Sequence, residues 1–71
     1  MARPVNIIKK CAGNILLYRT KSKLSQADVA KKVGISVSYV SMLERGERSP
    51  PLEVMAAIAR AIKVQPFELI K

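Results

Sequence analysis

An all-α fold, a compact bundle of five short helices, is predicted by three features of this chain. Apolar residues recur at the three- and four-residue spacing of amphipathic helices, without the alternation of a strand. Only 4% of the residues are aromatic, although 49% are hydrophobic. Glycine, serine and proline stand between the apolar segments as helix boundaries. Since 71 residues suit one domain, residues 6–71 are expected to form it, behind a short basic N-terminal arm of residues 1–5.

The first helix is expected to run from about Asn6 to Thr20. Its predicted core face carries Ile8, Cys11, Ala12 and Ile15. Leu16 and Leu17 extend its apolar surface beyond the single stripe that one core needs.

Local capping signals predict a second and a third helix. Ser25 and Asp28 have the spacing of a capping box, so the second helix is expected to begin directly after Ser25. Gly34 can take the left-handed backbone conformation that closes it. Ser36 is placed to cap the third helix, which Gly46 is expected to close.

Prolines mark the beginning of the last two helices. Pro50 and Pro51 suit the entry of a fourth helix, which is expected to run to about Lys63. Its predicted core side carries Leu52, Met55, Ala56, Ala59 and Ile62. A last short helix is expected from Pro66, carrying Phe67, Leu69 and Ile70.

The second and third helices together have the spacing of a helix-turn-helix. Such a motif needs two short helices that cross at roughly 90–120° through a turn of a few residues. The small or apolar residues that would hold both helices against a core are Val29, Ala30, Val33, Ile35, Val40 and Leu43. The outward face of the third helix is then free to enter a DNA groove.

The net charge favours an anionic partner. Thirteen Lys and Arg residues against five Asp and Glu give a formal charge of +8. Charge alone does not separate a nucleic-acid partner from a solvated basic surface, but the helix-turn-helix spacing favours double-stranded DNA. No membrane partner is expected, because no apolar run approaches the roughly 18 residues of a transmembrane span.

Composition also argues against an enzyme and against bound metal or cofactor. The chain has no histidine, no glycine-rich phosphate loop and no cluster of metal-ligating residues. Cys11 is its one cysteine, so neither an internal disulfide nor a zinc finger is expected. This cysteine usage fits a cytoplasmic protein.

Several short segments occur together in an order that is specific only in combination. They are Leu24-Ser25-Gln26, Val29-Ala30, Val33-Gly34-Ile35-Ser36, Val40-Ser41, Leu43-Glu44-Arg45-Gly46 and Pro50. Over about residues 11–70 the chain thus resembles the phage-repressor family of helix-turn-helix proteins, the Xre type, with its lambda-repressor-like fold. The resemblance implies a five-helix bundle and operator binding as a homodimer. Pro51 departs from the family, in which a serine commonly caps the fourth helix at this position.

Four residues of the third helix match family positions that approach base edges. They are Val37, Ser38, Ser41 and Met42. None of them is Arg, Asn or Gln, which make the most informative base pairings, so specificity is expected to depend partly on DNA shape. In the alternative interpretation, Val37 and Met42 pack against a neighbouring chain or loop.

A second set of residues is predicted to contact the DNA backbone. Gln26 stands at the beginning of the second helix, where backbone amides and the helix dipole favour a phosphate. Tyr39 is expected either to donate to a phosphate or to brace the turn. Arg45 and Arg48 follow the third helix, where phosphates or an adjacent base could be reached. The predicted backbone contacts are Gln26, Ser36, Tyr39, Arg45 and Arg48.

Arg19 and Glu44 are predicted to have a structural role. Glu44 would be a negative charge on the helix that faces DNA, which is unfavourable unless a cation neutralises it. The resemblance implies that Arg19 pairs with it and ties the first helix to the third, and arginine suits a bidentate bond to a carboxylate.

The function expected from these features is a sequence-specific DNA-binding transcriptional regulator, acting as a homodimer on a two-fold-related operator. The alternative is a protein-interaction module, such as an antitoxin that masks a partner protein. Surplus apolar surface supports a homodimer and is expected at Leu16, Leu17, Phe67, Leu69 and Ile70, with the interface at residues 67–70.

Overall fold

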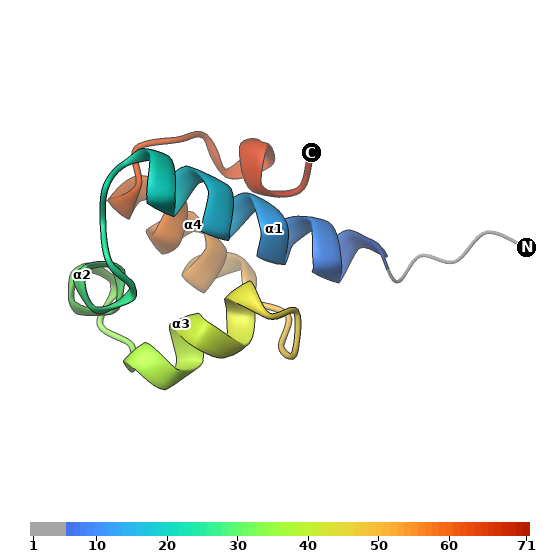
Figure 1. The fold of residues 1–71 in the computed structure, drawn as a ribbon. Coiled ribbons are helices and arrows are strands. Elements are labelled where there is room, and N and C mark those ends of the chain that lie inside the picture. Colours follow the sequence, from blue (N-terminus) through green and yellow to red (C-terminus); the bar gives the residue numbers. More distant parts are fainter. Residues whose placement is uncertain (1–5) are drawn as a thin grey trace, which may run out of the picture.

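The computed structural model describes residues 6–71, and the expected arm of residues 1–5 lies outside them. The elements in chain order are α1 (Asn6–Lys21), α2 (Gln26–Val33), α3 (Val37–Glu44), α4 (Leu52–Ala61) and the 3₁₀ turn η1 (Pro66–Leu69). α3 and η1 lie on opposite sides of α1 (Figure 1). Within residues 6–71, no helix is long and apolar enough to cross a membrane.

The all-α class is confirmed, but the expectation of five helices is wrong. The segment that begins at Pro66 makes a single 3₁₀ turn of four residues instead of a fifth α-helix. The fourth helix also ends at Ala61, earlier than the predicted Lys63. Lys63 itself has a φ of 62°, a left-handed conformation that an α-helix cannot contain.

The capping residues hold the boundaries of α2 and α3 as predicted. The Ser25 hydroxyl accepts the Asp28 N–H at 3.0 Å, and the Asp28 carboxylate accepts the Ser25 N–H at 2.8 Å. The latter bond is the main cause of the lowered pKa of Asp28. Gly34 closes α2 with a φ of 87°, and Ser36 caps α3 by accepting the Tyr39 N–H at 3.0 Å. At Pro51 the beginning of α4 has no side-chain cap.

All four α-helices end with the same reversal of the chain. One residue takes a positive φ, and the next N–H bonds back to a carbonyl five residues earlier, as in a Schellman motif. After α1 and α4 this residue is a lysine, Lys23 or Lys63, with φ near 60°. A side chain at such a φ strains the backbone, so these two helix ends are less favourable than the two that glycine closes.

The core lies where the α-helices and η1 meet, and among the described residues none of its buried side chains is aromatic. Its buried apolar residues are Cys11, Ala12, Ile15, Val29, Ala30, Val40, Leu43, Ile58, Ala59, Ile62 and Leu69. Leu52 was predicted to lie on the core side of α4, but it is 76% exposed, because the second half of that helix carries its buried residues. Ile8 on the predicted core face of α1 is likewise exposed.

The C-terminal segment is fastened along α1. The Asn14 side chain donates to the Leu69 carbonyl at 3.0 Å, and the Tyr18 hydroxyl donates to the Glu68 carboxylate at 3.2 Å. Leu69, which was wrongly predicted to be surplus surface, is buried in the core, whereas Phe67 and Ile70 are exposed.

Replacement of Lys63 by glycine should stabilise the domain by about 0.5–1 kcal/mol, because glycine adopts the left-handed conformation without strain and loses only part of that gain to chain entropy. Urea unfolding measures this change. Lys63→Ala is the matched control, since it removes the charge and keeps the strain. Equal stability of the two variants would contradict the assignment of strain.

Candidate nucleic-acid interface

The outward face of α3 is the candidate interface. Val40 and Leu43 are buried against the core, and Val29 and Ala30 of α2 are buried with them. Helical spacing places Val37, Ser38, Ser41 and Met42 on the opposite side. Val37 is 46% exposed, Ser38 is exposed, and Ser41 and Met42 are partly exposed. The four residues predicted to contact bases therefore share one accessible face of α3.

Two residues of the predicted backbone set also have structural partners. The Gln26 side-chain amide donates to Glu44 at 2.8 Å, so part of its hydrogen-bonding capacity is used within the protein. The Tyr39 ring is partly buried and packs against the core, a position that suits bracing of the turn. Ser36 directly before α3 and Arg48 in the turn after it are exposed, where a DNA backbone could pass.

Glu44, at the end of α3, is surrounded by donors. Arg19 donates to it twice, from Nε at 2.5 Å and from Nη2 at 3.0 Å, in addition to the bond from Gln26. Arg19 also donates to the Leu24 carbonyl at 2.8 Å. The two charged side chains are only 12% and 4% exposed. A carboxylate at a helix C-terminus is disfavoured by the helix dipole, and the arginine offsets that cost.

The next residue along the chain makes a separate, exposed network. Arg45 donates to the Glu47 carboxylate from Nε at 2.8 Å and from Nη2 at 3.1 Å, and its Nη1 donates to the Ser41 hydroxyl. The hydrogen bond from Arg45 lowers the pKa of Glu47 and raises that of Arg45. Glu47 was not among the predicted site residues, although opposite charges two residues apart were a visible signal.

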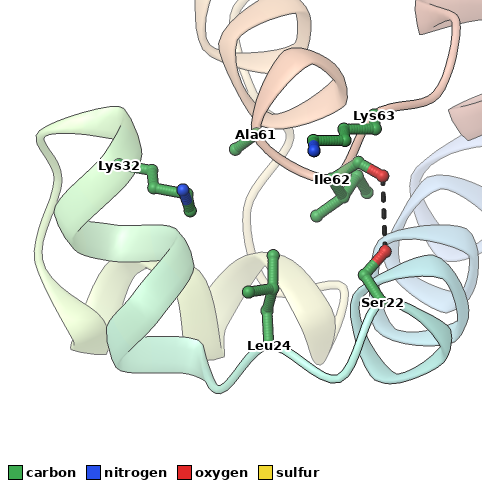
Figure 2. Close-up of a pocket in the computed structure, with 6 residues that line it drawn as sticks. All are labelled: Ser22, Leu24, Lys32, Ala61, Ile62 and Lys63. Atoms are coloured by element: carbon green, nitrogen blue, oxygen red, sulfur yellow. Dashed lines mark hydrogen bonds between the residues drawn. The ribbon is translucent and has the colours of Figure 1, made fainter.

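A hollow on another part of the surface lies where three helices end. Its lining residues are Ser22, Leu24, Lys32, Ala61, Ile62 and Lys63 (Figure 2). The Ser22 hydroxyl donates to the Ile62 carbonyl at 3.3 Å across one side of it. Lys32 lies in the last turn of α2, and Lys63 follows the end of α4, so both are near helix C-termini, where the helix dipole favours cations. These lysines therefore have a structural explanation. Among the described residues, no group of His, Cys, Asp or Glu is arranged to hold a metal ion.

Comparison with known proteins identifies the family. A family model described as "Helix-turn-helix" matches residues 15–69, which is more than half of the chain. The chain belongs to this helix-turn-helix family. The predicted likeness to phage repressors is also confirmed, since the repressor protein C2 of Salmonella phage P22 is 38% identical to this helix-turn-helix chain over 53 residues.

Two solved structures, and a relative that is matched over most of its own length, agree with this assignment. The restriction-modification controller protein C.AhdI from Aeromonas hydrophila is 34% identical, with a TM-score of 0.83 over 87% of this helix-turn-helix chain and 94% of that one. The P22 c2 repressor in complex with a synthetic operator is 34% identical, with a TM-score of 0.81 over 86% and 92% of the two chains. The HTH-type transcriptional regulator y4dJ of Sinorhizobium fredii is 34% identical, over 87% of this chain and 80% of its own length.

The share of each relative that is matched differs widely. The helix-turn-helix chain covers 80% of y4dJ but only 24% of the whole P22 repressor protein C2. The similarity to the P22 protein therefore concerns one domain of it.

Replacement of Arg19 by Met, or of Glu44 by Leu, should destabilise the helix-turn-helix domain by about 3–5 kcal/mol, because each change leaves one charge buried without its partner. The double replacement Arg19→Met/Glu44→Leu should cost much less, since no charge is then stranded. Thermal and urea unfolding of the four proteins measure this cycle.

The opposite result would reassign Arg19. If Arg19→Met left stability unchanged and reduced only the affinity for DNA, Arg19 would be a phosphate contact and its pairing with Glu44 incidental.

Proposed function

We propose that the chain is a sequence-specific DNA-binding transcriptional regulator that binds a two-fold-related operator as a homodimer. The observation that carries this proposal is the accessible face of α3, on a helix that Val40, Leu43 and Glu44 fix from the other side. A helix presented in this way can enter the major groove. The names of the relatives as regulators, repressors and a controller protein support a binding role in place of a catalytic one.

The side chains on this face indicate how bases are recognised. Val37 and Met42 suit apolar contact with a thymine methyl group, and Ser38 and Ser41 can bond to several bases. All four side chains are therefore short or apolar, and sequence-dependent groove shape supplies the rest of the discrimination.

Residues at the edges of α3 are proposed to hold the DNA backbone. Gln26 has a second amide N–H besides the one bonded to Glu44, and it stands in the first turn of α2, where the helix dipole favours a phosphate. Ser36 and Tyr39 at the beginning of α3, and Arg45 and Arg48 after its end, complete this set.

The dimer contact is proposed at η1. Phe67 and Ile70 are 57% and 48% exposed, and Leu17 of α1 is 48% exposed. Because η1 lies across α1 from α3, a partner on this surface would not cover the α3 face (Figure 1). A two-fold arrangement of this kind suits half-sites about 34 Å apart, one turn of DNA.

Binding to an operator selected from random DNA should weaken about 10³–10⁵-fold between about 50 and 200 mM salt, as expected if a dimer neutralises roughly 6–10 phosphates. Titrations by fluorescence anisotropy measure this dependence, and sedimentation of the complex should show two chains for each operator.

Two results would contradict the proposal. A flat salt response would remove the DNA-binding role, and a monomer on DNA at saturating concentration would remove the homodimer. The protein-interaction alternative would be favoured if a partner protein co-purified and if the chain bound no DNA either with or without that partner.

A further inference from the structure

Arg45 is hydrogen-bonded to Ser41, and both residues belong to the candidate interface. The arginine follows the serine by four residues, so both lie on the same side of α3. Its Nη1 donates to the Ser41 hydroxyl oxygen, while its Nε and Nη2 are held by Glu47 at 2.8 and 3.1 Å. The two ends of this arrangement are thus a partly exposed serine of α3 and a carboxylate in the turn after it.

The Glu47 carboxylate fixes the plane of the guanidinium. A bidentate bond of this kind constrains orientation as well as distance. Arg45 and Glu47 are 56% and 52% exposed, and pairs as open as this contribute little to folding stability. The consequence of the contact is therefore the orientation of Arg45 at the surface.

The same contact determines which hydrogen bonds Ser41 can offer. Its oxygen accepts from a cation, so its own proton is left to donate, and the nearby positive charge disfavours a second donor. The guanidinium uses three of its five N–H groups on Ser41 and Glu47, which leaves one on each terminal nitrogen. Ser41 and Arg45 together present hydrogen-bond donors at adjoining positions.

Guanine is the base whose major-groove edge complements two neighbouring donors. It offers the acceptors N7 and O6 side by side, whereas adenine pairs its N7 acceptor with the N6 donor, and cytosine offers a donor. We propose that Ser41 and Arg45 together recognise a guanine in each half-site, with Glu47 as the residue that positions Arg45. This inference rests on the proposed function, and it changes the role of Arg45 from a backbone contact to a base contact.

The test begins with a site selected from random DNA by the wild-type protein. Dissociation constants are then measured for guanine and adenine at each position, with the variants Ser41→Ala, Arg45→Gln and Glu47→Gln. Arg48→Gln is the matched control, because Arg48 is an exposed arginine in the same turn. Circular dichroism melts show that each variant is folded.

The wild type should prefer guanine to adenine about 5- to 100-fold at one position of each half-site, the range expected for one good pair of base contacts. Ser41→Ala and Arg45→Gln should each reduce this preference at that same position, and the double variant should lose less than the two single losses combined. Glu47→Gln should weaken the preference without lowering total affinity, because it also removes a negative charge from the interface. Arg48→Gln should weaken binding to all sequences alike.

Different outcomes would contradict this inference and the proposed function. If Arg45→Gln weakened every sequence equally, as Arg48→Gln does, Arg45 would be a phosphate contact and this inference would be wrong. The same holds if no position prefers guanine, or if the two variants alter different positions. If the wild type selected no common site at all, the proposed function would fail, and this inference with it.

Discussion

The arrangement of the helices depends on the hydrogen-bonded ion pair that the Glu44 carboxylate makes with Arg19. This carboxylate lies at the end of α3, accepts two bonds from Arg19 of α1 and one from Gln26 of α2, and is 4% exposed. Arg19 extends the network to the Leu24 carbonyl, in the loop between α1 and α2. Burial of the apolar core supplies most of the favourable free energy of folding, but the hydrophobic effect is not directional. We infer that the ion pair adds the directional contact that sets α3 against α1.

Glu44 and Arg45 are adjacent at the end of α3, but the first side chain is buried and the second is exposed. Glu44 points into the protein and neutralises Arg19, whereas Arg45 lies at the surface with Glu47. The face that carries Ser38 and Ser41 is thus free of the buried charge. Substitutions of the outward side chains therefore leave the pair of Arg19 and Glu44 in place.

Features that depend on neighbouring residues, such as helix caps, were predicted from the sequence more accurately than features that depend on tertiary packing. Ser25, Gly34 and Ser36 act on their own neighbours through caps and a left-handed turn, so the sequence predicted the bounds of α2 and the beginning of α3 correctly. Whether Leu52 is buried depends on which end of α4 meets the core. Helical periodicity shows which side of a helix is apolar, but not which end of it is buried. The spacing of Arg45 and Glu47 made their ion pair visible in the sequence, but it did not show that the same guanidinium also donates to Ser41.

Backbone amide hydrogen exchange in Glu44→Leu, compared with the wild type, tests the role of this carboxylate most directly. If the network joins the helices into one cooperative unit, the core amides of Val29, Leu43 and Ile58, in three different helices, should lose protection by a common factor of about 100- to 5,000-fold. A loss confined to the last turn of α3, or no loss at all, would contradict the account and leave the apolar core alone to position α3.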